Sequence, residues 1–103
     1  MSRVEKLLAM LQDNANDAFL QHALALEYIK LAQDDLALTT FENLLTANPD
    51  YVGSYYHLAK LQEKRGAVEQ AIITYEKGMA VAQKLNDRHA YGELHGAWEE
   101  LTM

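Results

Sequence analysis

The stretch NPDYVGSYYHLAKLQ, residues Asn48 to Gln62, decides the fold. It holds the only proline of the chain, Pro49, followed by aromatic and apolar residues at helical spacing. Proline disfavours helical geometry in the residue before it, and its missing N–H matters little in the first turn of a helix. The stretch therefore predicts that one helix stops at Asn48 and that Pro49 lies where the next one opens.

The sequence on the two sides of this proline repeats with a period of 34 residues. Leu24-Ala25 recurs as Leu58-Ala59. The other matches at this shift are Lys30 with Lys64, Ala37 with Ala71, Thr40 with Thr74, Glu42 with Glu76 and Phe41 with Tyr75. Residues 1–15 align with the second half of such a unit. The sequence therefore predicts two full units preceded by half of one.

Each unit is predicted to form two helices, because its apolar residues recur at helical spacing on one face. The expected N-cap of the first helix is Asp17, and that of the second is Asp34 or Asp35. In the next unit, Gly66 is the expected left-handed residue at the end of the first helix. The chain is therefore expected to be helical throughout.

The chain begins with a helix-start signal. Ser2 and Glu5 fit a capping box, in which each side chain bonds the backbone N–H of the other residue. Together with Met1, this pattern is typical of a native start. The incomplete first unit is equally consistent with a piece of a larger repeat array.

Composition excludes several classes of protein. The 103 residues include no cysteine, so disulfides and thiolate metal sites are excluded and a cytoplasmic location is expected. The formal net charge is −6 and no basic stripe is visible, so we expect no binding to nucleic acid or to an anionic membrane surface. No apolar run approaches the roughly 20 residues that a membrane span needs.

These residues resemble the tetratricopeptide repeat, with its ordered small and bulky positions. The matching residues are Leu24-Ala25, Tyr28, Ala37, Phe41 and Pro49 in one unit and Tyr55, Leu58-Ala59, Gly66, Ala71 and Tyr75 in the next. The resemblance implies an all-α fold, an antiparallel helix-hairpin stack of the α-solenoid type wound as a right-handed superhelix. It implies one domain, residues 1–103, made of a half-repeat helix at 1–15, repeats at 17–50 and 51–85 and a capping helix at 86–103.

Two positions depart from the family pattern. Gln62 stands where an aromatic residue is usual, and Gln83 stands where the closing proline is usual. Without that proline, we expect the preceding helix to run about one turn longer. At a shift of 36 residues, Tyr91, Leu94, His95 and Trp98 align with the first helix of the preceding unit. This alignment predicts a last helix from about residue 87 to 101.

The resemblance also implies a binding site, because the first helices of successive hairpins in this family line a concave groove that binds peptides. The residues at the groove positions are Phe19, His22, Leu26, Lys30, Tyr56, Lys60, Glu63, Lys64 and His89. Three lysines in an acidic chain favour a ligand with carboxylates, such as an acidic peptide or a C-terminus. The alternative is that Lys60 and Lys64 form only a solvated helix face.

The family includes a variant that clamps the carboxylate tail of heat-shock chaperones with lysines and asparagines. The residues at the clamp positions here are His22, Leu26, His57, His89 and Glu93. None of them matches the clamp, so binding of chaperone tails is not expected.

Gly92 and Gly96 would add to the groove from the last helix. They lie four residues apart, on one helix face, and each costs roughly 1 kcal/mol relative to alanine. They form either a shallow seat for a ligand or a second subunit, or they are simply tolerated near a fraying terminus.

Neither a catalytic nor a cofactor motif is present. The pairs His89–Glu93 and His95–Glu99 have a spacing that is common on helix surfaces, and there is no HExxH motif, so no metal site is expected. There is no Gly-rich phosphate loop and no serine in a nucleophile motif. Trp98 falls at a repeat position and is expected to pack. We therefore predict no cofactor and no enzymatic activity.

The sequence as a whole predicts a non-catalytic adaptor that binds a peptide or partner segment in the groove. The alternative is a self-associating structural module, a homodimer closed through the groove or through the last helix. A short stack covers little of its two ends, and self-association would cover them.

Overall fold

The computed structural model describes all 103 residues, which form six α-helices and no strand. The helices are α1 (Arg3–Asp13), α2 (Ala18–Lys30), α3 (Asp34–Ala47), α4 (Gly53–Lys64), α5 (Val68–Lys84) and α6 (Arg88–Thr102). The predicted all-α class is confirmed. The chain divides into two compact units, Met1–Pro49 and Asp50–Met103. The single domain with four segments and the right-handed superhelix stay predictions.

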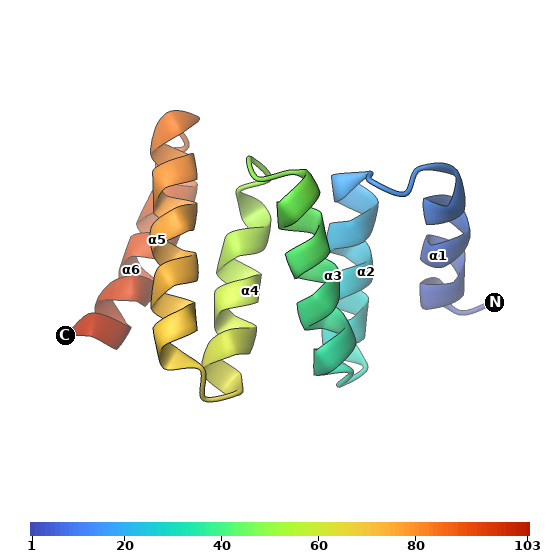
Figure 1. Cartoon of the computed structure of the whole chain (residues 1–103), viewed down its shortest axis with the longest axis horizontal. Helices are drawn as coiled ribbons and strands as arrows, with labels where there is room; N and C mark the ends of the chain where they lie inside the picture. Colours follow the sequence, from blue (N-terminus) through green and yellow to red (C-terminus); the bar gives the residue numbers. More distant parts are fainter. The chain divides into compact units, whose positions relative to one another are not determined.

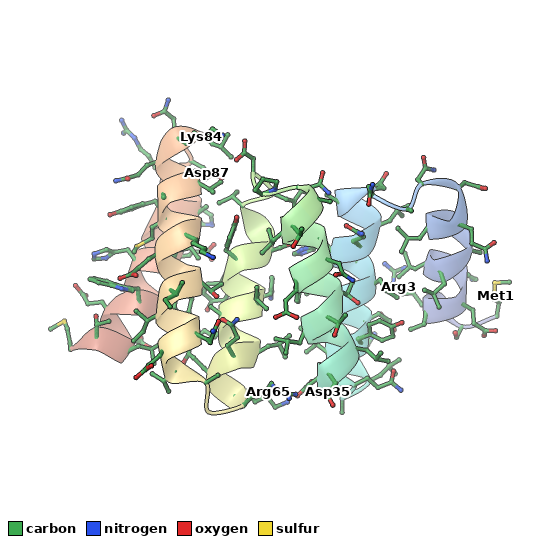
Figure 2. All side chains as sticks on the ribbon, in the orientation of Figure 1. Met1, Arg3, Asp35, Arg65, Lys84 and Asp87 are labelled. Carbon is green, nitrogen blue, oxygen red and sulfur yellow. The ribbon has the colours of Figure 1, made fainter.

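In the first unit, α2 packs against both α1 and α3, and consecutive helices run antiparallel (Figure 1). Ala25 of α2 and Ala37 and Phe41 of α3 are completely inaccessible. Alanines let the two helices approach closely, and the Phe41 ring fills the space beside them. Arg3, labelled in Figure 2, lies on α1 with its Nε 3.5 Å from Glu27 Oε2 of α2.

In the second unit, α5 packs against α4 and α6, and α4 also meets α6 (Figure 1). The completely inaccessible apolar residues here are Ala59, Ala71, Tyr75 and Ala82. Gly78 marks a tight approach, because a Cβ there would lie 2.7 Å from Tyr55 Cβ and 3.0 Å from Leu94 Cδ1. Position 78 of α5 therefore has no room for a side chain between α4 and α6.

Local side-chain caps set several helix starts. The capping box is confirmed, with Ser2 Oγ accepting from Glu5 N–H at 3.1 Å and Glu5 Oε1 accepting from Ser2 N–H at 3.0 Å. Asp17 Oδ1 accepts from Leu20 N–H at 3.0 Å, which confirms the predicted cap of α2. Asp87 caps α6 in the same way.

The prediction that Asp34 or Asp35 caps α3 is wrong. The N-cap of α3 is Gln33, which makes no side-chain cap bond, and both aspartates lie in the first helical turn. Their negative charges interact favourably with the positive end of the helix dipole. The helix therefore begins one residue earlier than a capping aspartate would require.

The proline ends a helix, but it does not open the next one. As predicted, α3 stops at Ala47, with Asn48 as its C-cap. The next helix, α4, begins only at Gly53, so Pro49 lies in the connecting turn and the expectation that it opens α4 is wrong. The Ser54 N–H donates to the Tyr51 carbonyl at 3.2 Å, so a turn that begins at Tyr51 leads into the first residues of α4.

Without a closing proline, α5 extends to 17 residues against 14 in α3, which confirms the predicted longer helix. Lys84 in its last turn lies close to the turn that leads into α6 (Figure 2). The Lys84 Nζ is 2.8 Å from Asp50 Oδ2. Both side chains are largely exposed, so this ion pair adds little stability. The last helix is confirmed to within one residue at each end.

Three helices end in the same left-handed turn. Gly66 has φ 80°, as predicted, while Ala32 and Asn86 have φ 60° and 56°. In each turn, this residue and the next one donate their N–H groups to carbonyls of the last helical turn, at distances of 2.8 to 3.1 Å. These bonds satisfy carbonyls that would otherwise lack a partner. The left-handed conformation is sterically unfavourable for alanine, less unfavourable for asparagine and not unfavourable for glycine.

We predict that Ala32→Gly raises the free energy of unfolding by roughly 0.5–1 kcal/mol, because glycine relieves the left-handed strain but is more flexible when unfolded. Urea denaturation measures the change. Gly66→Ala is the matched control: a Cβ there meets nothing within 4 Å, so only backbone strain is added and stability should fall. An Ala32→Gly variant less stable than the parent would contradict this account.

Candidate functional site

The predicted groove residues fall in both compact units, and their geometry is defined within each unit. The first unit contributes Phe19, His22, Leu26 and Lys30, all on α2. The second contributes Tyr56, Lys60, Glu63 and Lys64 on α4 and His89 on α6.

The predicted groove residues of α2 include two exposed apolar side chains. Phe19 exposes 70% of its surface and Leu26 exposes 37%, and Lys30 continues the same helix face as an exposed cation. His22 is half-buried, with its ring edge-on to the Phe41 ring at a centroid distance of 5.6 Å. Phe19 and Leu26 therefore remain open for contact, whereas His22 packs partly into the hairpin.

The second unit contains a cavity between α4 and α6. Its volume is about 270 Å³, and its lining residues are Tyr56, Lys60, Gly92, Glu93, Gly96, Ala97 and Glu100. Two predicted groove residues, Tyr56 and Lys60, therefore meet the two glycines of the last helix here. Glu63, Lys64 and His89 do not line the cavity.

The cavity adds acidic residues that the groove prediction did not include. Glu93 and Glu100 come from α6 and are seven residues apart, on one helix face. The sequence signal for them was this spacing around Gly96. The sequence already predicts that His89, Gly92 and Gly96 of this helix line the groove, but these two carboxylates are not among the predicted groove residues.

The glycines at the cavity are not required by helix packing. A Cβ added to Gly92 or to Gly96 would meet nothing within 4 Å, in contrast to Gly78. Both glycines line the cavity. They leave the α6 backbone uncovered over one part of its surface.

A chain of polar contacts fixes the α4 side of the cavity. Lys60 Nζ lies 5.5 Å from the centre of the Tyr56 ring and 3.6 Å from Glu63 Oε2. The same Glu63 oxygen accepts a hydrogen bond from the Tyr75 hydroxyl. The Tyr56 and Tyr75 rings meet edge-on at 6.3 Å. The charge of Lys60 is therefore already partly satisfied within the unit.

The Tyr75 hydroxyl is held in its protonated form. Burial raises the pKa of Tyr75 far above its ordinary value of 10.0, and the hydrogen bond to Glu63 raises the pKa further. The hydroxyl therefore remains a donor, and the Glu63 carboxylate remains its acceptor. This bond holds Glu63 in place beside Lys60.

Two further cavities lie at the turns between helices. One of about 330 Å³ lies at the α5–α6 turn and one of about 420 Å³ lies at the α2–α3 turn, and neither is lined by a predicted groove residue. No group of three or more histidine, aspartate or glutamate side chains is placed to hold a metal ion. None of the helices has the length and apolar character that crossing a membrane requires.

We predict that Tyr75→Phe lowers the free energy of unfolding at neutral pH by roughly 1–3 kcal/mol, because a hydrogen bond to a charged group is lost. The raised pKa means that the folded state keeps a proton that the unfolded state releases above about pH 10. The contribution of Tyr75 is therefore complete below pH 10 and declines as the pH rises further.

Urea denaturation at neutral pH and above pH 10 measures this effect, and the difference between parent and variant should narrow at the higher pH. Tyr91→Phe is the control, because no hydrogen bond of the Tyr91 hydroxyl is present. A Tyr75→Phe variant as stable as the parent at neutral pH would show that the bond to Glu63 contributes nothing.

Comparisons with known proteins agree with this geometry. Residues 20–51 and 52–85 each match the family model described as tetratricopeptide repeat. The solution structure of a tetratricopeptide repeat domain protein from Salinibacter ruber is 40% identical, with a TM-score of 0.81, over 84% of this chain and 87% of that chain. A crystal structure from the same organism gives 40% identity and a TM-score of 0.80, over 82% and 94% of the two chains.

A protein from Bordetella parapertussis is 28% identical, with a TM-score of 0.82, and the match covers 98% of this chain and 88% of that one. No curated protein matches the sequence at a significant level. Repeats of the matched family generally mediate interactions between proteins and generally serve as non-catalytic scaffolds. Since the two matched repeats span more than half of its residues, the chain belongs to the tetratricopeptide repeat family.

Proposed function

We propose that the protein is a non-catalytic adaptor that binds a segment of a partner protein at the α4–α6 cavity of the second unit, with the exposed face of α2 as a separate contact surface in the first unit. The observation that carries the proposal is the cavity, where Tyr56 and Lys60 from predicted groove positions meet the uncovered backbone at Gly92 and Gly96. Ligand sites are typically concave with a few placed polar groups, and three of the seven residues that line this cavity, Lys60, Glu93 and Glu100, are charged.

The α2 surface supports the same function. Phe19 leaves 70% of its surface in contact with solvent, although aromatic side chains of this size are usually well buried. Leu26 and Lys30 extend this surface along α2. Exposed apolar residues that share one face and are bordered by charge are typical of interaction surfaces.

The acidic ligand favoured by Lys30, Lys60 and Lys64 stays a prediction. Lys60 lies 3.6 Å from Glu63, so a ligand carboxylate would compete with Glu63 for this ammonium group. Lys64 is an exposed residue in the last turn of α4, outside the cavity. The lysines alone therefore do not settle the charge of the ligand.

Self-association through α6 is a second candidate function. Tyr91 stacks on His95 at 5.8 Å, and His95 lies 5.5 Å from Trp98, all on one face of α6. These three rings are only half-buried. Aromatic residues of this kind are enriched at protein interfaces.

Selection of peptides from a displayed random library tests the adaptor function. We expect reproducible binders, and we expect Phe19→Ala and Tyr56→Ala to weaken their binding by about tenfold or more. Ile73→Ala on α5 is the control, since Ile73 is 47% exposed but lies outside both surfaces. Circular dichroism checks that each variant is folded.

The adaptor proposal fails if no peptide is selected, or if the Phe19 and Tyr56 variants bind like the parent. Size-exclusion chromatography with light scattering separates the second candidate. A dimer that resists dilution and is lost in Trp98→Ala supports self-association, whereas a monomer argues against it.

A further inference from the structure

The charges around the α4–α6 cavity indicate which side chain it fits. Building on the proposed function, we propose that the cavity seats a basic side chain, lysine or arginine, of the partner segment. Its charged group lies between Glu93 and Glu100, and its methylenes lie over the backbone of Gly92 and Gly96.

The carboxylates of the cavity outnumber its cations. Its charged lining residues are Lys60, Glu93 and Glu100. Lys60 lies 3.6 Å from Glu63, and this partly exposed pair offsets part of its charge. Two negative charges, those of Glu93 and Glu100, remain at the α6 side.

These two carboxylates are available to a ligand. Glu93 has an ionic partner in His89, at 3.6 Å, but this pair is exposed and is attractive only when the histidine is protonated. Glu100 has no ion pair or hydrogen bond. A cation placed between the two would meet both carboxylates, whereas within the chain the imidazoles of His89 and His57 lie near Glu93 alone.

The shape of the cavity suits a long side chain. The seven-residue separation of Glu93 and Glu100 corresponds to roughly 10 Å along the helix axis, with Gly96 between them. Because nothing lies within 4 Å of a Cβ at Gly92 or Gly96, methylene groups can rest directly on the backbone. Tyr56 supplies an apolar surface for the same methylenes, as long basic side chains commonly use.

An acidic side chain fits this place less well. Its carboxylate would approach two glutamates and would compete with a third for Lys60. The net charge of −6 also attracts a basic segment from a distance and repels an acidic one. The cavity therefore favours a basic partner, contrary to the ligand that the lysines favour in the sequence.

The test uses the full chain and three pools of amidated nine-residue peptides with random flanks and a fixed central arginine, glutamate or leucine. We expect the arginine pool to bind about tenfold more tightly than the glutamate pool, with weaker binding at high salt.

The double variant Glu93→Gln/Glu100→Gln should remove this preference. Glu42→Gln/Glu99→Gln, with the same change in net charge away from the cavity, should bind as the parent does.

A second variant excludes loss of folding as the cause. Gly92→Ala/Gly96→Ala should raise the melting temperature, because alanine favours the helix and meets no neighbour, and yet should weaken binding of the arginine pool severalfold. Equal or tighter binding of the glutamate or leucine pool overturns the basic-side-chain inference and leaves the adaptor function standing. If none of the pools binds, both proposals fail.

Discussion

The close approach of paired helices at small residues is the constraint on which the structure depends. Where α2 packs on α3 and α4 packs on α5, the alanines of the repeat are completely inaccessible, and Gly78 allows no Cβ at all. Close helix pairs bury the bulky Phe41 and Tyr75 completely. Because the pairing faces of α2 and α4 are used in this way, other faces of the same helices stay exposed, and these carry the candidate binding residues.

Glycine serves two opposite purposes in the second unit. At Gly78 the neighbours are so close that only glycine fits, whereas at Gly92 and Gly96 an added methyl group would meet nothing. The first is a packing requirement, and the other two lower helix stability without any gain in packing. The latter two glycines line a cavity with the Tyr56 ring and the carboxylates of Glu93 and Glu100, so the proposed reason for this loss of stability is room for a ligand group on the helix backbone.

Strong local signals made most helix boundaries predictable: the capping box at Ser2, the cap at Asp17 and the left-handed Gly66 act through neighbouring backbone groups alone. The predictions for the cap of α3 and the start of α4 are wrong because local backbone turns set both places: the Gln33 N–H bonds the Tyr28 carbonyl, and the Ser54 N–H bonds the Tyr51 carbonyl. The left-handed Ala32 has no sequence signal, since alanine does not favour this conformation. Gln62 was recognised as unusual, but its reason needed the partner helix: Thr74 donates to its buried Oε1 at 2.6 Å. Likewise, Tyr56 and Lys60 are predicted groove residues and Glu93 falls at a clamp position, while Glu100 is identified as a site residue only by the cavity between α4 and α6.

The free energy of unfolding of Ala71→Leu, measured by urea denaturation beside Ala80→Leu, tests the central claim most directly. Ala71 is completely inaccessible and Ala80, on the same helix, is exposed, so both variants add the same atoms in opposite environments. The account predicts a loss of roughly 1–3 kcal/mol for Ala71→Leu, because the hairpin cannot take a larger residue there, and a change within about 0.5 kcal/mol for Ala80→Leu. Equal stability of Ala71→Leu and the parent would mean that close helix approach does not hold the hairpins together.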